Sequence, residues 1–291
     1  MKGTSHSKEK YSIIKNAKKK GSFFMKNQPI GMFDSGIGGM TVFQEVKEEL
    51  KTEKILYLGD TLNFPYGGKS RESIQALTKK GLEFCYQKGA KILVIACGTA
   101  TSQALEEVKK SMPVPVIGII EPTIDYIQEK KALKKIGVIA TAGSIRSQGW
   151  QKALKKARPD LEIKTNACPL LAPMAEEGWI KNEVARLTIQ EYLKDMHDID
   201  ALILGCTHYP LFEELIQEEL GKEIELINTG KLVAKKLKEI LKRTDSFNEE
   251  KVDFEKQYQI FVTDQEPNLD RMTNLILKNE KMKDQIQLVR I

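Results

Sequence analysis

Long apolar runs are missing from this sequence of 291 residues. None approaches the roughly 18 residues that a membrane-spanning helix needs; runs such as VPVIGII and ALILGC have the length of strands. The amino-terminal segment also lacks the apolar stretch of a signal peptide. We therefore expect a cytoplasmic protein with no membrane partner.

Cysteine and histidine are scarce, with four and three residues respectively. The cysteines, at positions 85, 97, 168 and 206, form no C-x-x-C pair and have no nearby histidine pattern. This composition argues against a disulfide framework and a zinc site, and it favours free thiols in a reducing compartment. We predict no bound metal.

A basic surplus is missing from the body of the chain. The formal net charge is +6, but residues 1–24 contain seven lysines and one glutamate, so the remainder is formally neutral. We interpret 1–24 as a disordered basic extension and expect no nucleic-acid partner. The alternative, an arm that binds nucleic acid or a membrane surface, predicts binding that depends on salt and requires this segment.

Nucleotide-binding motifs are also absent. The segment SGIGGMT has Thr41 where G-x-G-x-x-G requires its third glycine, and YGGKS has Asn63 where a P-loop requires its first. Neither dinucleotide nor nucleoside triphosphate binding is supported.

The sequence does contain ten strand-length apolar runs, nearly all separated by stretches with helical periodicity. Such alternation predicts parallel sheets covered by helices on both faces, and ten strands fit two lobes better than one sheet. We predict an α/β fold of two doubly wound lobes, 25–121 with 230–291 and 122–229, with the active site in the cleft between them. The predicted strands are 30–33, 55–59, 92–96, 116–119, 136–140, 161–167, 201–205, 224–227, 259–262 and 286–289. Predicted helices include 70–88, 101–110, 144–157, 182–196, 211–220 and 231–242.

The unusual short motifs follow the predicted strands, where ligands bind in parallel α/β sheets. They are FDSGIGG, GDTLNFPYGGKS, ACGTATS, ATAGS and GCTHYP. Cys97 and Cys206 each lie at such a strand end, before an expected helix start. Backbone N–H groups and the helix dipole there would lower a thiol pKa from about 8.5 towards neutrality. Cys85 and Cys168 are interpreted as buried structural residues.

Two cysteines in similar local sequences are redundant for a cysteine hydrolase or amidotransferase, which needs one cysteine and a histidine base. They suit a 1,1-proton transfer, in which one thiolate removes a proton from a tetrahedral carbon and a thiol on the opposite face delivers another. Reversing the handedness of the substrate exchanges their roles.

The segments IGMFDSGIGGMTV, DTLNFPYGGKS, ACGTATS, ACPLLAPMAEEG and LGCTHYPL together resemble the glutamate racemase family, over about residues 28–280. The resemblance implies interconversion of L- and D-glutamate without a cofactor, a supply of D-glutamate for peptidoglycan, and a homodimer. It implies that carbanion stabilisation comes from preorganised donors in a closed cleft.

The resemblance also implies individual roles. Cys97 and Cys206 would be the proton donors and acceptors, with Asp34, His208 and Glu176 assisting them. Substrate contacts would come from Asp34, Ser35, Tyr66, Gly67, Gly98, Thr99, Thr207 and His208, and Asp60 would be the acid of the GDT segment. The family usually has asparagine where this chain has Gly98, and an IDS or IDP segment where it has Asn228.

Two alternatives remain at this stage. One is a racemase of the same fold acting on aspartate, a hydantoin or another amino acid. The other is a two-lobed binding or regulatory protein without catalysis, in which replacement of either cysteine would be without effect.

Overall fold

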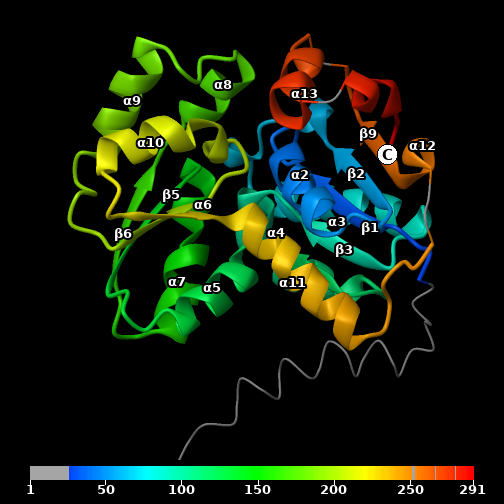
Figure 1. Ribbon diagram of the computed structural model, residues 1–291, viewed down its shortest axis with the longest axis horizontal. Coiled ribbons are helices and arrows are strands. Elements are labelled where there is room, and N and C mark those ends of the chain that lie inside the picture. The colour runs from blue at the N-terminus through cyan, green and yellow to red at the C-terminus, as the bar shows by residue number, and fades with distance from the viewer. Residues whose placement is uncertain (1–25, 251–252, 266, 279) are drawn as a thin grey trace, which may run out of the picture.

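The computed structural model describes residues 26–250, 253–265, 267–278 and 280–291. The predicted basic extension, 1–24, lies outside the described residues. The remainder alternates strands and helices, as predicted (Figure 1). The strands are β1 (Ile30–Asp34), β2 (Ile55–Gly59), β3 (Ile92–Ile95), β4 (Val116–Gly118), β5 (Lys135–Ala140), β6 (Glu162–Ala167), β7 (Ala201–Leu204), β8 (Glu225–Asn228), β9 (Tyr258–Val262) and β10 (Ile286–Leu288). The helices are α2 (Met40–Glu49), α3 (Arg71–Gln87), α4 (Gly98–Ser111), α5 (Ile120–Glu129), α6 (Ala142–Ser147), α7 (Gly149–Ala157), α8 (Leu171–Glu176), α9 (Glu183–Leu193), α10 (Glu213–Leu220), α11 (Thr229–Arg243), α12 (Phe254–Gln257) and α13 (Leu269–Leu277), with 3₁₀ turns η1 (Thr61–Asn63), η2 (Tyr66–Gly68), η3 (Tyr209–Phe212) and η4 (Glu280–Gln285).

The strands form two sheets, and every strand pair in them is parallel. The first sheet has the order β10-β9-β2-β1-β3-β4 and the second β6-β5-β7-β8. We call each sheet with its covering helices the first and the second lobe. The predicted α/β fold class with two parallel-sheet lobes is thus confirmed, while the exact residue limits of the lobes stay a prediction. The limit placed between 121 and 122 falls inside α5.

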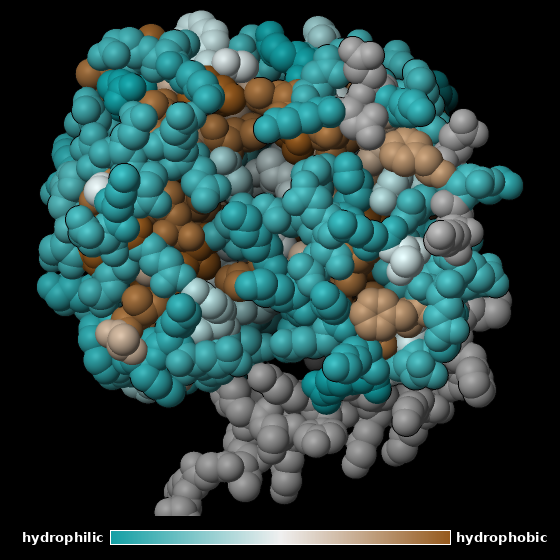
Figure 2. Space-filling view, viewed as in Figure 1, coloured by the Kyte–Doolittle hydropathy of each residue, from teal (hydrophilic) through white to brown (hydrophobic). Residues whose placement is uncertain are grey.

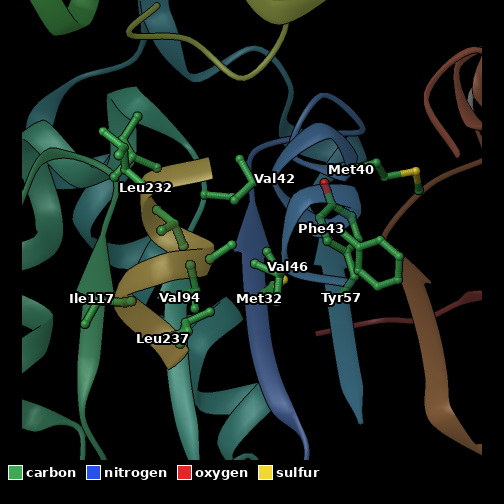
Figure 3. Close-up of a cluster of buried hydrophobic side chains, with 14 of the residues drawn as sticks. Met32, Met40, Val42, Phe43, Val46, Tyr57, Val94, Ile117, Leu232 and Leu237 are labelled. Atoms are coloured by element: carbon green, nitrogen blue, oxygen red, sulfur yellow. The ribbon is translucent and has the colours of Figure 1, made fainter. Parts of the chain in front are cut away.

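Side chains alternate between the two faces of a sheet. The strands of the first sheet are nearly continuous apolar runs, so both of its faces are apolar. One face, which includes Met32, Tyr57 and Val94, belongs to a core that also takes in side chains of α2 and α11. Figure 3 shows Leu232 and Leu237 of α11 next to these strands and to Val42 and Val46 of α2. The opposite face packs with side chains of α3 and α4, among them Ile74, Leu82 and Ala104.

The second sheet shares the first of these cores. Val138 of β5 and Ile203 of β7 belong to the same buried cluster as Met32 and Val94, together with Trp150 of α7. The other face of the second sheet packs with α8, α9 and α10. Helix α11 starts directly after β8 of the second sheet and packs against α2 and α5. The two lobes are therefore joined through a continuous apolar core.

All ten predicted strands are confirmed, to within a few residues at their ends. The prediction of one helix over 144–157 is wrong, because the segment forms two helices, α6 and α7, separated at Gln148. Gln148 has a left-handed backbone with a φ of 58°. A β-carbon at the next residue, Gly149, would lie 2.7 Å from Cβ of Ser102 in α4. The break thus accompanies close packing of this segment on the first lobe.

The face seen in Figure 2 is mainly hydrophilic, with hydrophobic residues showing towards the top, in the left half and in smaller patches on the right. Among the described residues, none of the helices combines the length and apolar character that a bilayer-spanning segment needs.

Candidate active site

The order of the strands determines where a ligand site can form. In the first sheet β2 lies on one side of β1 and β3 on the other, so the side on which strands are added switches between β1 and β3, although the strands stay parallel. The second sheet has the same switch between β5 and β7. Crevices form beyond the carboxyl ends of the strands at such switch points. Asp34 and Cys97 stand at the first, Thr141 and Cys206 at the second.

A cavity of about 160 Å³ lies at these strand ends and is lined from both lobes. Pockets for drug-sized ligands measure about 300–1,000 Å³, so this one suits a small metabolite. The lining residues are Ser35, Phe64, Pro65, Tyr66, Gly67, Cys97, Gly98, Thr99, Thr141, Ala142, Cys168, Pro169, Ala172, Pro173, Cys206, Thr207, His208 and Tyr209. Nine of the predicted site residues are among them, including both cysteines.

Cys97 is the residue that caps the amino terminus of α4. Its sulfur accepts a hydrogen bond from the backbone N–H of Ala100, at 3.4 Å, and its thiol donates one to Oγ of Ser35, at 3.3 Å. The expectation of a lowered pKa is wrong here: burial and the nearby charge of Asp34 raise the pKa of Cys97 to about 12, against the opposing effect of these hydrogen bonds. Loss of water around a thiolate outweighs the local helix-terminus effect.

Asp34 ends β1 and is 1% exposed. Its Oδ2 accepts hydrogen bonds from the backbone N–H groups of Gly36 and Gly39, at 3.0 and 3.1 Å, while its Oδ1 has no hydrogen-bond partner among the described residues. Burial raises its pKa to about 6, although the charge of His208 opposes the shift. Asp34 does not line the cavity, but its carboxylate is near enough to Cys97 for its charge to raise the pKa of that thiol.

Cys206 lies in the loop after β7. The expected helix start directly after it is wrong: residues 206–208 form a turn, the 3₁₀ segment η3 follows, and α10 begins only at Glu213. Pro210 stands near the start of η3. Cys206 therefore has no α-helix terminus behind it. Its polar neighbour is instead Nδ1 of His208, 3.9 Å from the sulfur.

His208 links Cys206 to a carboxylate. Its Nε2 lies 2.6 Å from Oε1 of Glu176, the last residue of α8, and both side chains are buried. Burial alone would lower the pKa of His208, but the hydrogen bonds to Cys206 and Glu176, together with their charges, raise it to about 10. The imidazole is thus held protonated at neutral pH, beside the second cysteine. Glu176 is not itself a lining residue of the cavity.

The first lobe contacts the loop that carries Cys206 at two points. Oγ1 of Thr41, in α2, donates a hydrogen bond to the backbone carbonyl of Thr207, at 2.7 Å. The ring of Phe64 lies 5.9 Å from the His208 ring, centroid to centroid. Contacts between the lobes therefore add to the contacts within each lobe that hold the site residues.

Tyr66 and Gly67, in η2, lie on the cavity wall. The Tyr66 hydroxyl donates to Oδ2 of Asp60, at 2.6 Å. The other carboxylate oxygen of Asp60 accepts from Asn63 and Thr263, at 3.0 and 2.9 Å. Asp60 thus fixes Tyr66 and lies outside the lining.

Gly98 and Thr99 open α4 and face the second lobe. A β-carbon at Gly98 would lie 2.2 Å from the backbone oxygen of Gly205. The two segments of the chain can therefore approach this closely only because residue 98 is glycine. Oγ1 of Thr99 lies 2.8 Å from Oγ1 of Thr141, the residue that caps α6. Thr141 was not among the predicted site residues, although ATAGS follows its strand in the same way as the other motifs.

The described residues contain no group of three or more His, Cys, Asp or Glu side chains that could hold a metal ion. All four cysteines are free and buried. The polar side chains of the cavity are thus the three thiols of Cys97, Cys168 and Cys206, an imidazole and hydroxyl groups, which is a set suited to moving protons.

The structure thus has two parallel α/β lobes and one cavity between them, lined by Cys97 from the first lobe and Cys206 from the second, which is the arrangement of an enzyme that acts on a small molecule. A family model described as Asp/Glu/Hydantoin racemase matches residues 30–237. The chain belongs to this family, and it is accordingly an isomerase of the racemase type.

Individual relatives agree. The chain is 42% identical to the glutamate racemase of Aquifex aeolicus (strain VF5) over 252 residues, 86% of this chain and 94% of that one. Its structure resembles that of glutamate racemase from Francisella tularensis subsp. tularensis SCHU S4 in complex with D-glutamate, with a TM-score of 0.84, 33% identity and coverage of 91% and 98%. It also resembles the Aquifex pyrophilus glutamate racemase, with a TM-score of 0.72, 38% identity and coverage of 86% and 95%.

Proposed function

We propose that the protein interconverts L- and D-glutamate by two-base proton transfer, with Cys97 and Cys206 as the acid and base on opposite faces of the α-carbon. The single observation that carries this proposal is that the two cysteines, one from each lobe, line the same cavity. The close relatives named glutamate racemase, and the neighbour bound to D-glutamate, support glutamate as the substrate.

In each direction one thiolate takes the α-proton, and the other thiol gives its proton to the carbanion from the opposite side. The electron pair of the broken C–H bond becomes that of the new one, so no oxidant or reductant is required. A buried thiol at Cys97 needs a nearby positive charge to ionise. The α-ammonium group of the substrate would supply it there, while the protonated imidazole of His208 would do so for Cys206.

The carbanion needs donors at the carboxylate of the substrate, because an amino-acid α-proton is much less acidic than a thiol. Ser35, Thr99 and Thr207 provide hydroxyl groups in the cavity wall, and the start of α4 provides backbone N–H groups. We propose that these groups replace a cofactor. Activity should then survive dialysis against a metal chelator and treatment with hydroxylamine, which captures pyridoxal.

The family resemblance extends the proposal to the cell. The D-glutamate would be made in the cytoplasm for peptidoglycan, and the enzyme would act as a homodimer. Sedimentation equilibrium tests the dimer, which requires a mass twice that of one chain. Restoration of growth in a bacterium dependent on added D-glutamate tests the role.

The decisive experiment follows the solvent proton. Incubation with L- or D-glutamate in D₂O should place deuterium at the α-carbon of the opposite enantiomer, and circular dichroism should show loss of optical activity. Cys97→Ser and Cys206→Ser should each abolish racemisation. If L-aspartate is turned over and glutamate is not, the alternative substrate is correct. If both cysteine variants keep full ligand binding and the wild type shows no exchange, the protein is a binder.

A further inference from the structure

The first lobe reaches across to the carboxylate that holds His208. Nδ2 of Asn268 donates a hydrogen bond to Oε2 of Glu176, at 2.9 Å, and a longer one to the Glu176 backbone carbonyl, at 3.4 Å. Asn268 precedes α13, which packs against α2 of the first lobe, whereas Glu176 ends α8 of the second. Figure 1 shows α8 and α13 facing each other across the top of the molecule.

The side chain of Asn268 makes this contact although it stands at a position where asparagine ordinarily caps the start of a helix. Asparagine at a helix start usually accepts a hydrogen bond from the backbone of the first turn. Asn268 occupies the capping position of α13 but makes no such bond, and its amide points to Glu176 instead. Arg271, one turn further on, adds hydrogen bonds to the Glu176 carbonyl and to the carboxylate of Glu177.

These contacts complete a chain of side chains from the second lobe to the first: Cys206, His208, Glu176 and Asn268. Each oxygen of the Glu176 carboxylate has one side-chain partner, His208 on Oε1 and Asn268 on Oε2. A carboxylate fixed at both oxygens cannot turn about its axis. The imidazole is thereby held in one orientation towards the sulfur.

We propose that Asn268 is a positioning residue for the Cys206 half of the site, which holds Glu176 against His208 from the opposite lobe. The inference rests on the proposed function, because it assigns the contact a part in proton transfer at Cys206. It adds that this half of the site is assembled only while α13 lies against α8. The charged or titratable groups around His208 are Cys206 on its own loop, Glu176 from α8 and Asp34 from β1.

Two substitutions at the same position separate positioning from a capping role. Aspartate is as good a helix cap as asparagine, so Asn268→Asp should be harmless if position 268 serves only α13. If its amide holds Glu176, Asn268→Asp places a second carboxylate against the first, and it should be more damaging than Asn268→Ala. The matched control is Asn274→Ala, which alters an exposed asparagine of the same helix.

We expect Asn268→Ala to lower kcat/KM for glutamate about tenfold, the effect of one lost hydrogen bond to a charged group. Asn268→Asp should lower it further, and Asn274→Ala should leave it unchanged. Because enantiomers have equal free energy, kcat/KM must fall equally in both directions. In the Glu176→Gln background, Asn268→Ala should have little additional effect, since the partner carboxylate is already gone. Equal, additive losses in the two backgrounds would overturn the proposal.

A measurement independent of catalysis distinguishes this inference from the proposed function. The sequence has three histidines, so the imidazole resonances of His208 can be identified by comparison with His208→Gln. In Asn268→Ala the freed carboxylate should leave the imidazole, and the pKa of His208 should fall from its raised value. An unchanged or higher pKa would refute the positioning role. A fall of the pKa in a protein that does not racemise glutamate would leave the contact established and refute the proposed reaction.

Discussion

The imidazole of His208 packs against Gly38 so closely that a β-carbon at position 38 would lie 2.3 Å from its Cε1 and 2.4 Å from its Nδ1. Gly38 lies between β1 and α2 of the first lobe, and His208 lies in the second. The wall against which the histidine rests is thus a stretch of backbone from the other lobe. A side chain there must push the ring away from Cys206 or the lobes away from each other.

Gly38→Ala is therefore expected to reduce racemisation severely. A displacement of about 1 Å in a reacting group can cost about 100-fold in rate, and we expect a fall in kcat/KM of that order. The control is Gly68→Ala, where a new β-carbon would meet nothing within 4 Å. Assay of both variants with D-glutamate is the measurement, and comparable activities would contradict this account of the packing.

Gly98→Ala should act on substrate affinity. The added β-carbon would lie 2.2 Å from the backbone oxygen of Gly205, so the two lobes could not approach as closely. A smaller fraction of closed molecules raises the apparent dissociation constant in proportion, and we expect KM to rise about tenfold. Gly98→Asn carries the same β-carbon and should raise KM as well. Unchanged KM values in both variants would show that the approach at Gly98 has no influence on binding.

The ion pair of His208 and Glu176 should make stability depend on pH. The folded pKa of His208 is raised to about 10, above the unfolded value of about 6.5. The stabilisation is fully present below pH 6.5 and is lost as pH rises towards 10, because only the unfolded chain then releases its proton. Urea unfolding of the wild type at pH 6.5, 8 and 10 should show this decline. Glu176→Gln should flatten it, and an identical slope in the variant would exclude the pair as its source.

Asn228→Asp should weaken the start of α11. Asn228 caps that helix through Oδ1, and its Nδ2 donates to Oε1 of Glu45, at 3.2 Å. Aspartate would keep the cap but oppose two carboxylates, of which Glu45 already has a pKa raised chiefly by burial. We expect a loss of about 1 kcal/mol of stability at pH 8. The loss should shrink near pH 4, where carboxylates take up protons.

The same substitution in the Glu45→Gln background provides the control. There the new aspartate faces a neutral amide, and it should cost little at either pH. A penalty that persists in this background would mean that the repulsion is not the cause.

The strands and the location of the site could be predicted from the sequence because their signals are local. Runs such as Ile92 to Ala96 are apolar on both faces, which only buried parallel strands require, and chain order then brings their carboxyl ends together. The pKa of Cys97 differs from the prediction, because it is raised and not lowered. A cysteine at a helix start is visible in the sequence, whereas the depth of its burial depends on residues that are distant in the chain and surround it only in the fold.

Contacts between distant segments explain the other differences. Nothing near Asn268 marks it as a partner of Glu176, because the two residues are far apart in the chain and meet only when the lobes do. The break at Gln148 likewise accompanies the packing of Gly149 against Ser102 of the other lobe. Thr141 did carry a signal, since ATAGS follows a strand as the other motifs do.

The apolar core shared by the two sheets affects how the protein unfolds. Because α11 leaves the second sheet and covers the first, neither sheet can melt without exposing apolar surface that belongs to its neighbour. Heating should therefore produce one calorimetric transition whose enthalpy matches the van't Hoff value, as in a single cooperative unit. Both lobes would then unfold in the same transition, and activity would be lost with it, without an intermediate in which one lobe stays folded.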